Sequence, residues 1–432
     1  MLKDNFLSPF QKFVKIESFS GILLFFATIL ALVWANSPLS DLYHNLWDYK
    51  IGISSEAFSL EKPLKIWVND GLMAIFFFLI GLEIKRELII GEINTIKKAA
   101  FPLFGALGGM LVPIAFFIVL NKSPESSHGW GIPVATDIAF SLAILKLIGK
   151  KVPIGLKVFL TAYAIIDDLG AVMVIAIFYS TGIKWILLGI ALTIVVFLLI
   201  LSSKRIYSKY VFGIGGVIVW LLFLKSGIHP TVAGVLMAFT IPIRQKIEND
   251  TFIKKIPELV RNFGQGKTKE PVLSNEQLNL LSALESCTSK VQSPLQHLEH
   301  KLSPWVAYLI MPVFALANAG VSFGGSAQLD TSLIFTIAAA LVFGNFIGVG
   351  SMAFISIKLK IAELPANVTS MHMLGMALLA GVGFTMAIFI ANLAYPESQF
   401  MIDSSIVGIL IGSAISGLAG FLVLKLATRK GK

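Results

Sequence analysis

Long apolar segments, separated by short stretches with charges, glycine or proline, recur along the whole chain. An α-helix needs about 20 apolar residues to cross the hydrocarbon core of a bilayer. By this criterion the pattern predicts twelve transmembrane helices, at 18–35, 66–84, 100–120, 129–147, 155–180, 183–203, 208–225, 227–243, 304–323, 331–357, 368–395 and 404–427. The first segment is longer than the apolar core of a signal peptide, so we expect it to be retained as a helix.

Polar segments set the predicted domain organisation. They divide the chain into a tail, eight helices, a polar loop, four helices and a second tail, at 1–17, 18–243, 244–302, 304–427 and 428–432. Residues 37–65 alternate between apolar and polar, and both a short external β-hairpin and an irregular loop fit this pattern. The loop at 244–302 is rich in Lys, Glu, Gln and Ser, which favours a flexible linker with one amphipathic helix around 274–287.

Composition excludes a soluble protein. Hydrophobic residues make up 56% of the chain and charged residues 14%, and the mean hydropathy is +0.81. An average soluble protein has roughly 25% charged residues, and a soluble fold cannot hide this much apolar surface. The fold class is therefore predicted to be an all-α polytopic membrane protein. The single cysteine, Cys287, excludes an internal disulfide and any multi-cysteine metal site.

The net charge of +10 indicates orientation in the membrane rather than a nucleic-acid partner. Of the 35 Lys and Arg residues, 29 fall in the termini and in the connections after even-numbered spans, against six on the opposite side. Cytoplasmic loops carry the excess of basic residues, so both termini and the segment 244–302 are predicted to be cytoplasmic. No basic cluster belongs to a folded soluble domain, which excludes nucleic-acid binding.

Two adjacent acids, Asp167 and Asp168, lie at the centre of the fifth span. Acid at mid-membrane depth costs on the order of 2.5–3.5 kcal/mol and usually marks an ion path. Neighbouring residues on a helix point about 100° apart, so the two carboxylates are predicted to face different partners. Desolvation and mutual repulsion oppose ionisation of both, and such a group can exchange a proton for a hard cation. The structural alternative is a polar pair that joins helices by hydrogen bonds.

A third acid, Asp137, follows a proline that interrupts the fourth span. Pro133 frees backbone groups that are tolerated at membrane depth only in a buried or water-filled site. Asp137 is therefore a candidate ion ligand or a neutraliser of a helix N-terminus, and a simple kink with a capping Asp is the alternative. Gly381 and Gly383 weaken the eleventh span at mid-depth, which suggests matched inverted repeats.

The second span carries acids at both ends. Asp70 lies near its outer end, where an interfacial cap and a functional acid fit equally. Glu83, Arg86 and Glu87 share one face at the inner end. Two interpretations fit them equally: a gate that senses cytoplasmic pH, and a solvated interfacial cluster.

Five motifs make the chain resemble the NhaA-type sodium/proton antiporters of bacterial inner membranes. They occur in the family's order and spacing and read NDGLMA, GLEIKREL, ATDIAF, AIIDDLG and ANAGV, at 69–74, 81–88, 135–140, 164–170 and 317–321. The resemblance covers nearly the whole chain except an insertion at 245–295. It implies twelve helices, with broken fourth and eleventh helices that cross at the midplane.

The resemblance also implies roles for individual residues. Asp168 would be the main Na⁺ or Li⁺ carboxylate, with Asp167, Asp137 and Thr136 beside it. A pH-responsive cytoplasmic entrance would comprise Glu83, Arg86, Glu87, Glu299 and His300. The external hairpin would form the contact of a homodimer. The implied activity is pH-regulated export of sodium in exchange for protons by alternating access, with no cofactor besides the transported ions.

Two positions depart from the family pattern. The lysine that the family has in its tenth helix, where it pairs with the first Asp of the fifth, corresponds here to Asn345. Asn can hydrogen-bond Asp167 but cannot neutralise it, so the exchange of two protons per sodium ion is not implied. A histidine of the entrance corresponds to Ser303, so the pH threshold is expected to differ.

Two other function classes compete with antiport. A passive cation channel of the same fold would lack saturable, proton-coupled flux. An intramembrane aspartyl protease would need Tyr-Asp on one helix and Gly-x-Gly-Asp on another, and neither pattern occurs.

Overall fold

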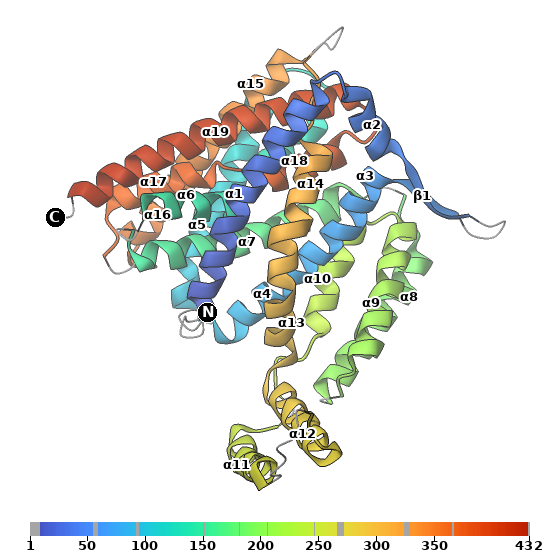
Figure 1. Cartoon of the computed structure of the whole chain (residues 1–432). Helices are drawn as coiled ribbons and strands as arrows, with labels where there is room; N and C mark the ends of the chain where they lie inside the picture. The colour runs from blue at the N-terminus through green and yellow to red at the C-terminus, as the bar shows by residue number, and fades with distance from the viewer. Residues whose placement is uncertain are drawn as a thin grey trace.

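The protein is a bundle of helices with one small sheet (Figure 1). The computed structural model describes residues 9–54, 59–91, 95–149, 152–180, 182–204, 206–245, 247–265, 272–323, 329–364 and 367–430. Within these ranges, 8 helices are long and apolar enough to cross a membrane, or up to 9 if a bent pair counts as one span. The chain is therefore a multi-pass membrane protein, as its composition predicts.

Most helices of the first block, residues 18–243, follow the predicted spans, but α2 lies within 37–65, where the sequence predicted a hairpin or an irregular loop. The helices of this block are α1 Pro9–Ala35, α2 Ser40–Asp48, α3 Leu64–Ile66, α4 Met73–Ile90, α5 Ile96–Leu120, α6 Ile138–Ile148, α7 Ile154–Phe178, α8 Trp185–Ser203, α9 Lys209–Ser226 and α10 Pro230–Thr240. A π-helical turn, η2 (Trp67–Leu72), leads into α4, and a 3₁₀ segment, η3 (Ser127–Val134), precedes α6. The shortest of the predicted spans is also short in the structure, because α10 has 11 residues between Pro230 and Ile241.

The second block continues the bundle. It contains α14 Met311–Asn318, α15 Thr331–Ala339, α16 Asn345–Lys358, α17 Ser370–Ala380, α18 Phe384–Ala394 and α19 Gln399–Lys430. Two π-helical turns each join two consecutive helices without a break. η4 (Val306–Ile310) joins α13 to α14, and η5 (Ala340–Gly344) joins α15 to α16. Sequence periodicity did not predict these turns.

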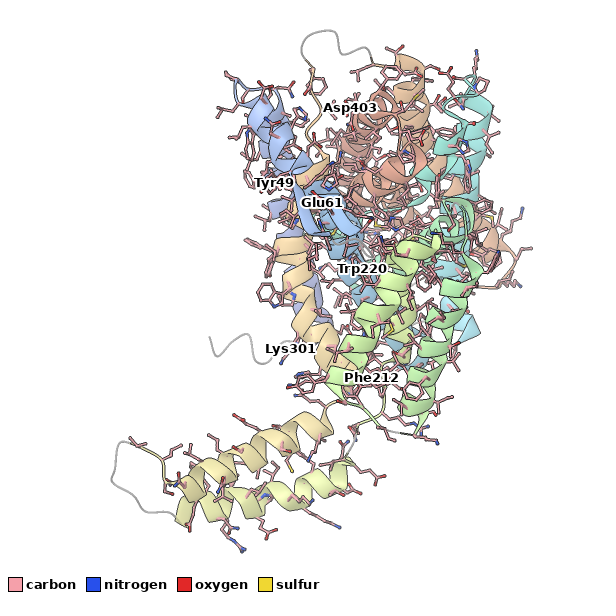
Figure 2. All side chains as sticks on the ribbon, turned by 90° about the vertical axis from the view of Figure 1, so that its right-hand side faces the viewer. Tyr49, Glu61, Phe212, Trp220, Lys301 and Asp403 are labelled. Atoms are coloured by element: carbon pink, nitrogen blue, oxygen red, sulfur yellow. The ribbon has the colours of Figure 1, made fainter. Side chains whose placement is uncertain are left out.

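A β-hairpin follows α2, which decides between the two structures that the sequence allowed for 37–65. β1 (Lys50–Ser54) and β2 (Ser59–Pro63) pair antiparallel, with Ile51 opposite Lys62. The indole nitrogen of Trp67 donates to the carbonyl of Ile51 at 2.8 Å and ties the hairpin to η2. Tyr49 and Glu61, beside and within the hairpin, lie toward the end of the molecule opposite Lys301 (Figure 2).

The polar loop corrects a prediction. The expected helix around 274–287 is present as α12 (Asn275–Val291), but 249–265, predicted as part of a flexible linker, forms α11. The reason is a helical apolar pattern that the polar composition obscured: Phe252, Ile256, Leu259 and Phe263 are half-buried at a spacing of three to four residues. α11 packs on α12, and the pair projects beyond the bundle before α13 (Pro294–Trp305) returns the chain (Figures 1 and 2).

A close helix crossing in the bundle is made by two glycines, Gly108 on α5 and Gly348 on α16. A Cβ atom added at either one would lie within 3.0 Å of the other's carbonyl oxygen. The two backbones therefore touch, as is common between membrane helices that pack through small residues. This contact fixes α16, and with it Asn345, against α5.

A methyl group at this crossing should destabilise the fold. We expect Gly108→Ala to lower the free energy of unfolding by about 1–3 kcal/mol, because the added carbon overpacks the contact. Thermal unfolding of the purified protein in detergent micelles measures the loss. Gly189→Ala on α8 is the matched control, since nothing lies within 4 Å of a Cβ there. Equal melting of the two variants would show that the crossing tolerates expansion.

Candidate functional site

Two helix interruptions meet inside the bundle. η3 ends at Val134 and α6 begins at Ile138, while α17 ends at Ala380 and α18 begins at Phe384. The backbone nitrogen of Asp137 donates to the carbonyl of Val382 at 2.6 Å, which joins one interruption to the other.

Pro133, Gly381 and Gly383, which the sequence analysis identified, allow the two interruptions to lie close to each other. Pro133 has no backbone donor, so it breaks the ladder of helical hydrogen bonds just before the gap. Gly381 and Gly383 provide space, because a Cβ at either position would lie within 3.0 Å of the backbone oxygen of Leu341 or of Ala135, respectively. A larger residue at Gly383 would push the two interruptions apart, and one at Gly381 would collide with Leu341 of η5.

Asp137 lies between two helix N-termini. One carboxylate oxygen accepts from the backbone nitrogen of Phe140 at 3.0 Å, in the first turn of α6. The other accepts from the backbone nitrogen and the hydroxyl of Thr385 at 3.2 and 2.6 Å, in the first turn of α18. Helix N-termini carry unsatisfied donors and a partial positive charge, so one buried carboxylate compensates both.

The carbonyl ends at the interruptions are bound as well. The hydroxyl of Thr136 donates to the carbonyl of Ala380 at 2.7 Å, and the amide nitrogen of Asn345 donates to that of Pro133 at 3.3 Å. Few backbone groups at the crossing are therefore left to the apolar interior, which is the condition for irregular backbone at membrane depth.

The paired carboxylates of α7 have different surroundings, as the sequence predicts. Asp167 is fully buried, and one of its oxygens accepts from the backbone nitrogen of Thr136 at 2.9 Å. Asp168 is 5% exposed and lines a cavity of about 30 Å³. Thr136, Asp137 and Thr385 line the same cavity, as does Glu83 of α4.

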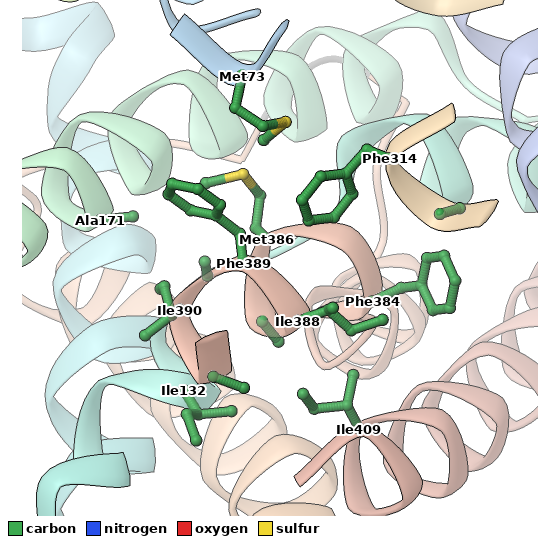
Figure 3. Packing of buried hydrophobic residues seen from close by; sticks show 14 of the residues in the cluster. Met73, Ile132, Ala171, Phe314, Phe384, Met386, Ile388, Phe389, Ile390 and Ile409 are labelled. Atoms are coloured by element: carbon green, nitrogen blue, oxygen red, sulfur yellow. The ribbon is translucent and has the colours of Figure 1, made fainter. Parts of the chain in front are cut away.

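The cavity is small and its remaining walls are apolar. Its volume matches the space that about one water molecule occupies, so it has room for a single dehydrated ion. Carboxylate and hydroxyl oxygens are the ligand atoms that hard cations prefer. Met386 lines the cavity from α18, and Figure 3 shows it packed with Phe389, Met73 and Phe314. Met386 and the other apolar lining residues, among them Phe76 and Met311, surround the oxygen atoms with a low-dielectric shell.

Asn345 is buried at the start of α16, with 1% exposure. Its amide nitrogen binds the carbonyls of Pro133 and Leu341, rather than the carboxylate of Asp167. The side-chain oxygen of Asn345 and Oδ1 of Asp167 accept no hydrogen bond from any described residue. The hydrogen bond that an amide could donate to Asp167 is thus replaced by a bond to the interruption itself.

A charge cluster forms around Arg86 at the end of α4. Its guanidinium contacts Glu87 at 2.7 Å and Glu299 at 3.0 Å, so a residue from α13 joins the two from α4. Burial raises the pKa of the Glu299 carboxyl, while Arg86 beside it acts in the opposite direction. His300 is exposed at the neighbouring position, and the structure does not bring it into this cluster.

Asp70 joins three elements instead of capping a helix. Its carboxylate contacts Lys62 of β2 at 2.9 Å and the imidazole of His229, which precedes α10, at 3.4 Å. The indole of Trp220 donates to its backbone carbonyl at 3.0 Å. The hairpin, η2 and the start of α10 are therefore held together at this point.

Sequence reasoning missed three polar residues near these sites. Thr385 stood inside the glycine-rich stretch of the eleventh span, but a threonine in an apolar segment gave no sign of its partner. Tyr163, whose hydroxyl lies 3.2 Å from that of Thr136, resembled any aromatic core residue. His229 was visible only as a histidine before a proline. Within the described ranges, no group of three or more His, Cys, Asp and Glu side chains is arranged so that it could hold a metal ion.

The chain matches the family model described as Na⁺/H⁺ antiporter 1 over residues 11–424. It is 44% identical to the Na⁺/H⁺ antiporter NhaA of Oleidesulfovibrio alaskensis, over 99% of this chain and 95% of the relative. It is also 44% identical to NhaA of Helicobacter pylori strain P12 and 42% identical to NhaA 2 of Helicobacter hepaticus. Both of these alignments cover 98% of this chain and 96% of the relative. The chain therefore belongs to the Na⁺/H⁺ antiporter 1 family of secondary transporters.

Proposed function

We propose that this protein exports Na⁺ or Li⁺ in exchange for protons, with Asp168 as the principal ion-binding carboxylate. The observation that carries the proposal is the ion-sized cavity in which Asp168 meets Asp137, Thr136 and Thr385 at the two helix interruptions. The names of the relatives agree with this exchange.

Exchange follows from competition for one carboxylate. A deprotonated Asp168 attracts a cation, and a proton bound to it removes that attraction. Because the surrounding shell is apolar, leaving the charge uncompensated is costly, so an empty, ionised site is disfavoured. The carrier then changes sides loaded with either a cation or a proton, which couples the two fluxes. Asp137 lines the same cavity, and Asp167 precedes Asp168 on α7.

Alternating access is the form of motion that we assign. The proposed architecture has twelve spans in two inverted repeats, with the fourth (η3 and α6) and the eleventh (α17 and α18) broken at their crossing. Transporters with such repeats place their ion sites at broken helices near the midplane. Relative rotation of the parts that flank the crossing would expose the cavity to one side at a time.

The remaining assignments concern the surroundings of the site. The protein would lie in a bacterial inner membrane with both termini and 244–302 in the cytoplasm, in line with the distribution of its basic residues. Glu83, Arg86, Glu87 and Glu299 would form the pH-responsive cytoplasmic entrance. His300, which follows Glu299 in the chain, would add a further titratable group. The hairpin would contribute to a homodimer.

Removing the charge of Asp168 tests the principal assignment. We expect Asp168→Asn to abolish sodium-induced dissipation of the pH gradient in everted membrane vesicles, because an amide cannot exchange a proton for a cation. Asp403→Asn is the control, since that carboxylate accepts a bond from Gln399 on α19, away from the cavity. Full activity of Asp168→Asn would contradict the assignment.

Thr385 should matter through Asp137. Thr385→Val keeps the shape of the side chain and removes the hydroxyl bonded to Asp137 at 2.6 Å. A hydrogen bond to a charged group contributes about 1.5–3 kcal/mol, so we expect the apparent KM for Na⁺ to change by about tenfold or more. Thr193→Val is the matched control, because the Thr193 hydroxyl bonds only to the carbonyl of Gly189 on an exposed face of α8. An unchanged KM in Thr385→Val would show that this contact is dispensable.

The charge at position 345 should set the electrical character of the cycle. Asn345→Lys introduces a cation beside the helix interruption, and we expect it to change the charge moved per cycle or to shift the pH profile. Electrogenic current on a supported membrane, driven by a Na⁺ gradient at two pH values, measures both. Identical current and pH profile in the variant and the parent protein would assign the position a purely structural role.

A further inference from the structure

Tyr163 is a fully buried tyrosine of α7 with its polar group close to the ion site. It lies one helical turn before Asp167, so the two side chains project from similar faces of the helix. Within the described part of the chain, its hydroxyl has one hydrogen-bond partner, Oγ1 of Thr136, at 3.2 Å. A hydroxyl in an apolar interior is costly without a bond, and phenylalanine would fill the same space without that cost. The hydroxyl therefore indicates a role beyond packing.

Packing fixes the position of this hydroxyl. Gly105 and Gly109 lie one turn apart on α5, which is beside α7 (Figure 1). A Cβ atom at Gly105 would lie 3.4 Å from the ring of Tyr163, and one at Gly109 would lie 2.5 Å from its hydroxyl oxygen. Phe159 stacks on the ring from the preceding turn of α7, with the ring centroids 6.2 Å apart. Two helices therefore hold the phenol group, as precise positioning of a site requires.

The partners of Thr136 decide which hydroxyl donates. Thr136 has a single hydroxyl proton, and it donates this proton to the carbonyl of Ala380 at 2.7 Å, because a carbonyl oxygen can only accept. Tyr163 must therefore donate to Thr136. The two bonds form a chain from α7, through the interruption of the fourth span, to the end of α17. In such a chain each bond polarises and strengthens the next.

Thr136 is thus held on α7 at two points. Its backbone nitrogen donates to Asp167 at 2.9 Å, and its side-chain oxygen accepts from Tyr163. A hydroxyl oxygen has two lone pairs, and Tyr163 uses one of them. With the proton directed to Ala380, the other lone pair is left for the cavity that Thr136 lines. A cation in the cavity needs this lone pair and would be repelled by the proton.

We propose that Tyr163 is a positioning residue of the ion site that acts through Thr136. Its hydroxyl keeps the Thr136 oxygen turned with a lone pair toward the cavity, and it holds the interruption of the fourth span against the carboxylates of α7. Tyr163 does not line the cavity itself, so the ion never contacts the phenol. This role rests on the proposed exchange, because it concerns the binding of the same ion.

Tyr163→Phe is the diagnostic variant, because it removes the hydroxyl and keeps the ring. We expect the apparent KM for Na⁺ to rise about three- to tenfold, the range that loss of one neutral hydrogen bond gives. The kcat should stay within about twofold, since the lost bond supports ion binding rather than the motion between the two sides. Na⁺-driven proton flux of the full-length protein in proteoliposomes measures both values.

Gly109→Ala reaches the same hydroxyl from α5. Its methyl group would collide with the phenol oxygen, so we expect it to raise the KM for Na⁺ in the parent protein. In the Tyr163→Phe background this oxygen is absent, and the methyl group should add little, so the two effects should be non-additive. Tyr43→Phe is the matched control. Tyr43 is also buried, and its hydroxyl donates to the carbonyl of Leu316 at 2.7 Å, away from the cavity.

The three measurements also separate this role from the exchange itself. A parent protein without Na⁺-driven proton flux would overturn both. Exchange by the parent protein with an unchanged KM in Tyr163→Phe, or with a fall in kcat alone, would overturn the role of Tyr163 and leave the exchange intact. Additive effects of Gly109→Ala and Tyr163→Phe, or an equal rise of the KM in Tyr43→Phe, would overturn that role as well.

Discussion

The contact between Asp137 and two facing helix N-termini is the interaction on which the rest of the structure depends. Backbone donors inside a bilayer must be satisfied by the protein, because the hydrocarbon offers no water. Two helices that begin near each other in an apolar interior also bring two partial positive charges together. Asp137 meets both demands through Phe140 and Thr385. The crossing of the two interrupted segments therefore depends on an acceptor at this position, and an ionised acid also offsets the partial positive charges.

That requirement also shapes the proposed chemistry. The interruptions remove helical backbone from the centre of the bundle and leave a small cavity bordered by oxygen atoms, into which α7 brings Asp168. Large apolar side chains close the cavity on its other sides, so a charge inside it is stabilised by a few fixed partners rather than by solvent. A carboxylate in such a place favours binding either a cation or a proton. The helix interruptions, which need Asp137 as an acceptor, thus also create the cavity on which the proposed exchange depends.

Much of this could be predicted from the sequence, because the strongest signals are local. Apolar length predicted the helices of both blocks, and Pro133, Gly381 and Gly383 marked the interruptions. Acids in apolar segments stood out for the same reason. What failed depends on partners distant in the chain: Thr385 lies 248 residues from Asp137, and the amide of Asn345 turned to Pro133, 212 residues away, rather than to Asp167. In α11, polar composition concealed an apolar stripe, so a linker was predicted where a helix forms.

The most direct test of the account is whether cation binding displaces protons from the protein. Isothermal titration calorimetry of Na⁺ binding to the purified protein, repeated in two buffers with different ionisation enthalpies, measures the protons released for each Na⁺ bound. Competition at Asp168 predicts proton release near neutral pH and loss of that release, together with Na⁺ binding, in the Asp168→Asn variant. Binding of Na⁺ with the same heat in both buffers, and hence no proton release, would contradict it.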